Sequence, residues 1–136
     1  MSTEIKFVAT SDDYLDTSYE RASRAHATKE EYERIELRAV DAEGRNLGGL
    51  QAFRSYSRLV IDLLSVEPDQ QSKGIGAELL TRAENWGRDN CCFQAHLNTQ
   101  YAEAFYKREG YTTVFADKRG VEGGGYFLMV KELTDD

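Results

Sequence analysis

The chain has few of the residues that usually build disulfide frameworks or metal sites: two cysteines and two histidines among 136 residues. Cys91 and Cys92 are adjacent, and on a strand their side chains would point to opposite faces, so we expect no disulfide between them. His26 and His96 are isolated, and neither a Cys-x-x-Cys nor a His-x-x-x-His spacing occurs. We therefore predict no metal site and interpret the cysteines as small buried hydrophobes.

Long hydrophobic runs are also missing. No apolar stretch approaches the roughly 20 residues of a membrane-spanning helix, and the first ten residues, MSTEIKFVAT, lack the apolar region of a signal peptide. We expect a cytoplasmic protein without a membrane partner. A length of 136 residues with 40% hydrophobic residues fits one domain, residues 1–136, with its own core.

The charge balance is acidic, with 24 Asp and Glu against 17 Lys and Arg and a formal net charge of −7. A negative protein repels the phosphates of nucleic acid, so we expect no nucleic-acid partner. A small-molecule or peptide amine suits this charge better. The oligomeric state stays open, a homodimer included.

The most informative segment runs from Val66 to Leu80 and reads VEPDQQSKGIGAELL. A strand-like run ends at its start, a helical pattern begins at its end, and Gly74 and Gly76 lie between them. Glycine lets the backbone approach a ligand closely, and the first turn of a helix presents unpaired N–H groups to an anion. The segment predicts a diphosphate site, although a tight strand-to-helix turn without a ligand would use the same glycines.

Two common phosphate loops are excluded by spacing. The Rossmann pattern G-x-G-x-x-G would need a third glycine where Leu79 stands. The nucleoside triphosphate loop needs Gly-Lys followed by Ser or Thr, which occurs nowhere in the chain.

A second pattern covers residues 97–111, LNTQYAEAFYKREGY. A helical spacing relates Ala102, Phe105, Tyr106 and Glu109, and Gly110 stands where a helix is expected to end. By position alone, Tyr106 would more often be a partly buried core tyrosine than a functional one.

The two patterns together, Gln-x-x-Gly-x-Gly after Val-x-Pro and Ala-x-x-Phe-Tyr-x-x-x-Gly-Tyr, resemble the coenzyme A motifs of the GCN5-related N-acetyltransferase (GNAT) superfamily. The resemblance covers nearly the whole chain. It implies an α/β fold with a mixed central β-sheet, helices on both faces and the order β-α(α)-β-β-β-α-β-α-β-β. It also implies acetyl-CoA as cosubstrate, bound by Leu64, Ser65, Val66, Gln71, Ser72, Lys73, Gly74, Ile75, Gly76, Ala77, Asn98, Thr99, Phe105 and Tyr106.

The resemblance further implies roles in catalysis. Tyr106 would lie beside the thioester sulfur and protonate the departing thiolate. A backbone N–H near Leu64 or Ser65 would stabilise the developing oxyanion.

The chain departs from the family pattern at two places. Gln71 stands where members often have arginine, with Lys73 nearby to supply a charge. Thr99 replaces an asparagine that many members have, and Asn98 precedes it by one position. We therefore expect the loop to hold the pyrophosphate through its backbone, while the side-chain contacts to the pantetheine arm depart from the family pattern.

Asp62 is the one charged residue in the apolar run LVIDLLSV, residues 59–66. This run predicts a central strand covered on both faces, and a carboxylate buried there needs compensation. Either Asp62 pairs with Arg38, Arg54 or Arg58 on neighbouring positions, or it is a catalytic base that takes a proton from an amine directly or through water. Both interpretations stay open.

Hydrophobic periodicity predicts the remaining elements. A helix capped by Thr10 or Ser11 is expected to continue, whole or broken, to Tyr32. In the helix at residues 76–88, Glu78/Arg82 and Glu84/Arg88 are predicted to pair on the exposed side. Strands are predicted at residues 4–9, 34–40, 47–54, 59–66, 91–97, 111–116 and 126–131.

The sequence thus predicts an acetyl-CoA-dependent N-acetyltransferase acting on a primary amine by direct attack in a ternary complex. The alternative is a non-catalytic module that binds or senses coenzyme A on the same fold.

Overall fold

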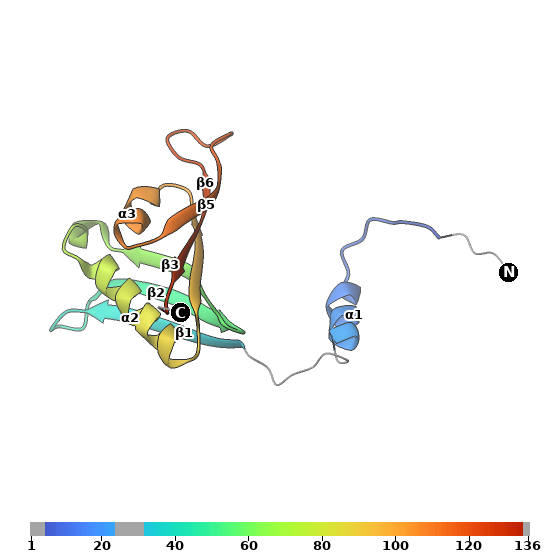
Figure 1. Cartoon of the computed structure of the whole chain (residues 1–136), viewed down its shortest axis with the longest axis horizontal. Helices are drawn as coiled ribbons and strands as arrows, with labels where there is room; N and C mark the ends of the chain where they lie inside the picture. The colour runs from blue at the N-terminus through green and yellow to red at the C-terminus, as the bar shows by residue number, and fades with distance from the viewer. Residues whose placement is uncertain (1–4, 24–31, 135–136) are drawn as a thin grey trace. The chain divides into compact units, whose positions relative to one another are not determined.

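The computed structural model describes residues 5–23 and 32–134, which fall in two compact units, residues 1–30 and 31–136. Each unit is described by itself, and Figure 1 shows its elements. In the first unit, helix α1 spans Tyr14–Ser23. The backbone N–H of Tyr14 donates to Oδ1 of Asp12 at 3.1 Å, so Asp12 caps the helix and the predicted Thr10 or Ser11 cap is wrong.

A strand was predicted at residues 4–9, but residues 5–13 form neither a helix nor a strand. The prediction is therefore wrong over residues 5–9. A short alternating run becomes a strand only when a neighbouring strand completes its backbone hydrogen bonds. Residue 4 and the predicted helical stretch over residues 24–31 lie outside the described residues. Tyr32 begins a strand and does not end a helix.

The second unit is built on a six-stranded mixed sheet in the order β1-β2-β3-β4-β6-β5. All neighbouring strands are antiparallel except β3 and β4, which are parallel as predicted. The strands are β1 Tyr32–Val40, β2 Asn46–Ser55, β3 Arg58–Val66, β4 Gln94–Thr99, β5 Thr112–Asp117 and β6 Tyr126–Glu132. The 3-10 turn η2 at Pro68–Gln70 and helix α2 at Ile75–Asp89 connect β3 to β4, and helix α3 at Glu103–Arg108 follows β4.

The two parallel strands separate along their length. Their pairing runs from Arg58 with Gln94 to Val60 with His96 and ends there. Beyond this point β3 stays paired with β2 as far as Val66, and β4 stays paired with β6. The sheet is therefore split between the carboxyl ends of β3 and β4, and the backbone of β3 after Val60 has an edge without a partner strand among the described residues.

Helix α2 packs across β1, β2 and β3 and supplies much of the core. Its apolar stripe, predicted from the sequence, buries Leu79, Leu80 and Ala83. Burying an aliphatic side chain of this kind contributes about 1.5–3 kcal/mol. The other buried apolar residues are Leu50, Ala52, Leu59, Ile61, Cys92, Ala95, Leu97, Tyr106, Tyr111, Phe127, Met129 and Leu133.

The charged side of α2 is only partly as predicted. Glu78 and Arg82 form the expected ion pair at 2.8 Å. Glu84, however, is just 3% exposed and does not pair with Arg88. Its two carboxylate oxygens accept hydrogen bonds from the Tyr111 hydroxyl and from Nζ of Lys131, both at 2.9 Å.

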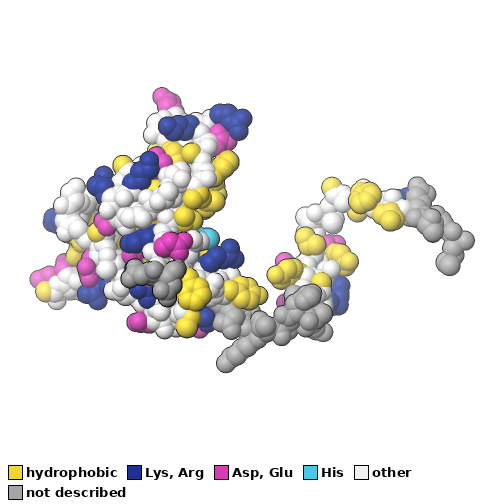
Figure 2. All heavy atoms as spheres, viewed as in Figure 1, with side chains coloured by type: hydrophobic (Ala, Val, Ile, Leu, Met, Phe, Trp, Pro, Cys, Tyr) yellow, Lys and Arg dark blue, Asp and Glu magenta, His cyan; other side chains and the backbone are white. Residues whose placement is uncertain are grey.

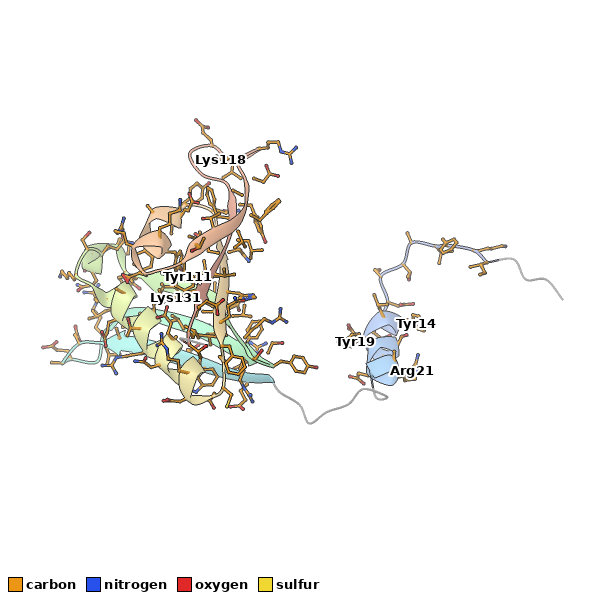
Figure 3. All side chains as sticks on the ribbon, in the orientation of Figure 1. Tyr14, Tyr19, Arg21, Tyr111, Lys118 and Lys131 are labelled. Atoms are coloured by element: carbon orange, nitrogen blue, oxygen red, sulfur yellow. The ribbon has the colours of Figure 1, made fainter. Side chains whose placement is uncertain are left out.

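This buried group holds α2 to the far half of the sheet. Lys131 also donates to the backbone oxygen of Glu109 at 2.9 Å and lies over the Tyr111 ring, 5.7 Å from its centroid. Figure 3 shows Tyr111 and Lys131 beside each other. Because each polar atom has a partner, the burial of the Glu84 carboxylate is compensated.

The two cysteines differ from the prediction in one respect. Cys92 is buried and Cys91 is exposed, and both are free thiols. Cys91 has a φ of 65° and lies before β4, which begins only at Gln94. No helix in the described part of the chain is long and apolar enough to cross a membrane.

Candidate functional site

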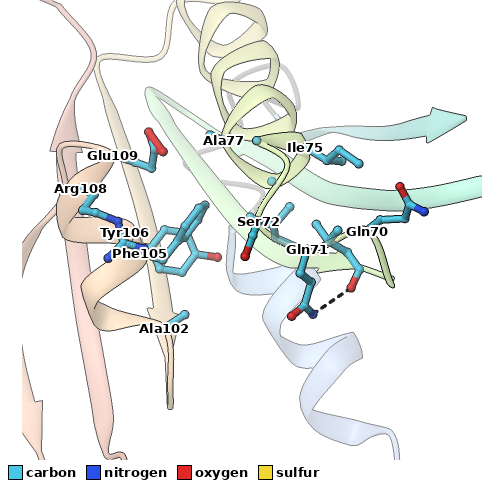
Figure 4. Close-up of a pocket in the computed structure, with 14 residues that line it drawn as sticks. Gln70, Gln71, Ser72, Ile75, Ala77, Ala102, Phe105, Tyr106, Arg108 and Glu109 are labelled. Carbon is cyan, nitrogen blue, oxygen red and sulfur yellow. Dashed lines mark hydrogen bonds between the residues drawn. The ribbon is translucent and has the colours of Figure 1, made fainter. Parts of the chain in front are cut away.

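A cleft of about 580 Å³ lies between the carboxyl end of β3, the loop before α2 and one side of α3. Figure 4 shows the side chains that face it. The lining residues are Leu64, Val66, Gln70, Gln71, Ser72, Gly74, Ile75, Gly76, Ala77, Ala102, Phe105, Tyr106, Arg108 and Glu109. Both sequence motifs therefore contribute to one cavity.

The loop is held by its own contacts. The amide nitrogen of Gln71 donates to the backbone oxygen of Val66 at 3.2 Å, as drawn in Figure 4, so this side chain ties the loop to β3. Lys73 Nζ lies 3.3 Å from Oε1 of Gln70. Ser72 and Gly74 have φ values of 66° and 83°, in the left-handed region. Gly74 is the N-cap of α2, and glycine adopts such a φ at little cost.

The first turn of α2 faces the cleft with Ile75, Gly76 and Ala77. The N–H groups of a first helical turn have no acceptor within the helix, and the helix dipole makes this end positive. Among the described residues, no side chain caps the N-terminus of α2. These backbone groups are consequently suited to an anion with several oxygen atoms, such as a diphosphate.

At the base of the cleft, Gly76 lies close to Phe105 and Val66 and has no side chain that would fill the space between them. A Cβ at this position would lie 3.5 Å from Cζ of Phe105 and 3.6 Å from Cγ2 of Val66. One methyl group fits there in ordinary contact, whereas a branched side chain would extend into the cleft. The role expected for this glycine, a close approach of its backbone to a ligand, stays a prediction.

Tyr106 projects from α3 into the cleft with its hydroxyl directed toward the loop (Figure 4). The residue is 8% exposed, and its ring packs edge-on against Phe105 and Tyr111 at centroid distances of 5.0 and 5.7 Å. Burial raises the pKa of the phenol above its usual value near 10. Since no described residue hydrogen-bonds to the hydroxyl, a protonated donor is directed into the cavity.

Four residues predicted to contact the coenzyme do not line the cleft: Ser65, Lys73, Asn98 and Thr99. Ser65 alternates with Leu64 and Val66 along β3 and lines a separate hollow with Leu63. Thr99 has a structural task, because its Oγ1 accepts a hydrogen bond from the backbone N–H of Ala102 at 3.2 Å. This contact holds the turn that leads into α3.

Four lining residues were not predicted from the sequence: Gln70, Ala102, Arg108 and Glu109. Ala102 belongs to the second motif, and its position there was a signal for its role. Arg108 and Glu109 follow Tyr106 within the same segment, so the helical spacing was available as a signal for them too.

Asp62 is exposed, and the prediction that it is buried is wrong. It is the extra residue of a β-bulge, because Leu63 pairs with Gln51 and Ile61 pairs with Ala52. Its neighbour Leu63 is 62% exposed, so this end of β3 is not covered on both faces within the second unit.

The predicted ion pairs of Asp62 are likewise absent from the described part of the chain. Arg38 pairs with Glu36 at 2.9 Å and Arg54 pairs with Glu33 at 2.5 Å. Asp62 instead lines a hollow of about 400 Å³ together with Arg34, Ile35, Glu36, Gln51, Ala52 and Phe53.

Several solved structures share the fold at low sequence identity. An acetyltransferase from Bacillus cereus ATCC 14579 is 21% identical, with a TM-score of 0.83 over 93% of this chain and 97% of its own. A putative acetyltransferase from Agrobacterium tumefaciens is 20% identical, with a TM-score of 0.77 over 97% and 99%. An aminoglycoside 6'-N-acetyltransferase complexed with coenzyme A is 17% identical, with a TM-score of 0.69 over 93% and 83%.

No curated protein sequence matches the chain. The model of the acetyltransferase (GNAT) domain matches residues 23–113, which include β1 to α3, the loop before α2 and both motifs. The chain therefore belongs to the acetyltransferase (GNAT) domain family.

Proposed function

We propose that this protein transfers the acetyl group of acetyl-CoA to a primary amine of a small molecule or peptide. The observation that carries the proposal is that the α2 N-terminus and the Tyr106 hydroxyl face the same cleft. The first supplies an anion site and the second supplies a proton donor. The formal charge of −7 favours an amine acceptor, which is cationic before it reacts.

The coenzyme would be bound mainly by backbone groups. The N–H groups of Gly74, Ile75, Gly76 and Ala77 would hold the pyrophosphate at the positive end of α2. Gln71 and Ser72 would support this part of the cleft, with Gln71 acting through its hydrogen bond to Val66. Lys73 would add a positive charge close to the loop without lining the cleft.

The split in the sheet would orient the thioester. The pantetheine arm of the coenzyme contains two amide groups, which can pair with an open strand edge as a further strand would. The edge of β3 after Val60 has no partner strand among the described residues, and it continues to Leu64 and Val66 in the cleft. A backbone N–H near Leu64 or Ser65 would then stabilise the oxyanion that develops on the acetyl carbonyl.

Tyr106 would act as the general acid. When the amine nitrogen bonds to the acetyl carbon, the bond from carbon to sulfur breaks and the sulfur leaves as a thiolate. The Tyr106 hydroxyl would donate its proton to that sulfur. The raised pKa keeps the phenol protonated throughout the neutral pH range.

Asp62 is proposed as the base that takes up the proton of the amine, through water because the side chain is exposed. It lies two residues before Leu64, which lines the cleft, and it shares its own hollow with Glu36 and Gln51. Phe105 would contact the coenzyme from the wall of the cleft, whereas Asn98 and Thr99 would act from outside it, Thr99 by holding the start of α3.

The proposal is tested by following free thiol while acetyl-CoA is incubated with polyamines, amino acids, aminoglycosides and peptides. An enzyme of this kind releases thiol only when a suitable amine is present. A protein that binds the coenzyme and releases no thiol with any amine is instead the sensing module.

A further inference from the structure

Arg108 is the one positively charged side chain among the described residues that line the cleft. The residue is exposed, and it forms no ion pair or side-chain hydrogen bond with any described residue. A guanidinium group without a partner is fully available to a ligand in the cavity.

The neighbouring Lys107 is exposed as well, but it differs from Arg108 in its pairing and in its position. It is paired with Glu103 at 3.5 Å and does not line the cleft. Both residues lie in the last turn of α3, where a positive charge interacts favourably with the helix dipole. Both Lys107 and Arg108 can therefore stabilise α3 through the helix dipole. Only Arg108 also lines the cleft.

Arg108 and the α2 N-terminus belong to different walls. The backbone amides around Gly76 come from one side of the cleft, and Arg108 comes from the end of α3 on the other (Figure 4). Coenzyme A carries two phosphate groups of different kinds, a pyrophosphate within the chain and a phosphomonoester on the ribose. The α2 N-terminus supplies several N–H donors for the first and leaves the second without a partner on that wall.

We propose that Arg108 binds the ribose 3'-phosphate of coenzyme A and so makes the protein select the phosphorylated coenzyme over its dephosphorylated form. This inference rests on the proposed function. The planar guanidinium group donates two parallel hydrogen bonds to a phosphate, which a lysine ammonium does not match. Arg108 is a binding residue and touches no reacting atom, so it changes affinity and leaves the acetyl-transfer step unaltered.

The test measures the dissociation constants of coenzyme A and of dephospho-coenzyme A, which lacks only the 3'-phosphate, by calorimetric titration. The whole chain is used, as wild type, Arg108→Gln and the matched control Lys107→Gln. In the wild type, coenzyme A is expected to bind about 5–30-fold more tightly than dephospho-coenzyme A, in the range of a partly screened charge-assisted hydrogen bond. Arg108→Gln removes this difference by weakening coenzyme A alone, and Lys107→Gln retains it.

Arg108→Lys keeps the charge without the bidentate geometry, so it should retain part of the preference. Equal weakening of both ligands in Arg108→Gln, or an unchanged preference, would overturn the role of Arg108 while leaving the proposed function intact. A wild-type protein that binds neither ligand would contradict the coenzyme site itself.

Discussion

Gly76 and Phe105 meet at the base of the cleft, where a Cβ on Gly76 would stand 3.5 Å from Cζ of Phe105. This relationship joins the two sequence motifs, since the glycine belongs to the loop before α2 and the phenylalanine belongs to α3. It also shows how little space remains for a side chain at the point where the backbone approaches the ligand.

The first prediction follows from this distance. Gly76→Val places a branched side chain between Phe105, Val66 and the cleft. Its two methyl groups would occupy space that the bound coenzyme needs, so the affinity for coenzyme A should fall by at least ~10-fold. Gly76→Ala is the matched control, because its single methyl fits in ordinary contact. Calorimetric titration measures both affinities, and similar values for alanine and valine would show that the ligand does not approach Gly76.

A second prediction separates strain from ligand binding. Gly74 and Gly44 have nearly equal positive φ values, 83° and 82°, and a Cβ at either would meet no atom within 4 Å. Replacing each by alanine should cost about 1–2 kcal/mol of stability through left-handed strain alone. Only Gly74→Ala should also weaken coenzyme A, because Gly74 lines the cleft. Thermal melts and titrations of the two variants make this comparison, and equal affinities would remove the Gly74 backbone from the site.

Tyr106→Phe should lower kcat by roughly 10²–10⁴-fold, the usual range of a general acid, and leave the affinity for acetyl-CoA within a few-fold. Burial raises the pKa of Tyr106 above its usual value near 10, so the phenol stays protonated as the pH rises toward 10. The wild type should accordingly show no loss of kcat attributable to this group as the pH rises toward 10. A full rate in the phenylalanine variant would assign Tyr106 to packing.

Asp62→Asn tests the base. Because Asp62 is exposed and has no ion pair in the described part of the chain, the variant should keep its stability within about 0.5 kcal/mol. Its kcat/KM should fall by roughly 10²–10⁴-fold, the range of a general base. Thermal melts and steady-state rates are measured on the same preparation. An unchanged kcat/KM would leave deprotonation to water or to the substrate.

The buried group around Glu84 gives a prediction about stability. Tyr111→Phe leaves one oxygen of the buried carboxylate without its donor and should cost about 1–3 kcal/mol, whereas Tyr126→Phe, at an exposed position, should cost little. Burial, followed by the Glu84 charge, raises the pKa of Tyr111. Its contribution is therefore fully present below pH 10, the unfolded value, and is lost as the pH rises further. Denaturant unfolding between pH 8 and 11 should show a smaller alkaline decline in Tyr111→Phe than in the wild type.

Much of the fold could be predicted because its signals are local. The helix expected at residues 76–88 is α2 at Ile75–Asp89, and the glycine spacing correctly located its N-terminus. On the surface shown in Figure 2, acidic and basic side chains are interspersed over the sheet unit, as its mixed charged composition suggests. The arrangement of the two motifs around one cleft was expected from their resemblance to the coenzyme A motifs of the GNAT superfamily, because local patterns alone do not bring two separate segments together.

The remaining features depend on contacts between distant residues. Glu84 is buried because Tyr111 and Lys131 reach it from 27 and 47 residues away, which helical spacing cannot show. The run at residues 59–66 is apolar throughout, yet Leu63 is exposed, since coverage of a strand face is a tertiary property. Arg108 entered no prediction because it occupies one of the unspecified positions of the second motif, between Tyr106 and Gly110.

The most direct measurement of the central claim is mass spectrometry of an amine acceptor after incubation with acetyl-CoA that carries a deuterated acetyl group. The account predicts an acceptor that gains one labelled acetyl group for each molecule of free coenzyme A formed, with strongly reduced transfer in Gly76→Val and Tyr106→Phe. Binding of acetyl-CoA without labelled product from any amine, or release of thiol without an acetylated acceptor, would contradict it.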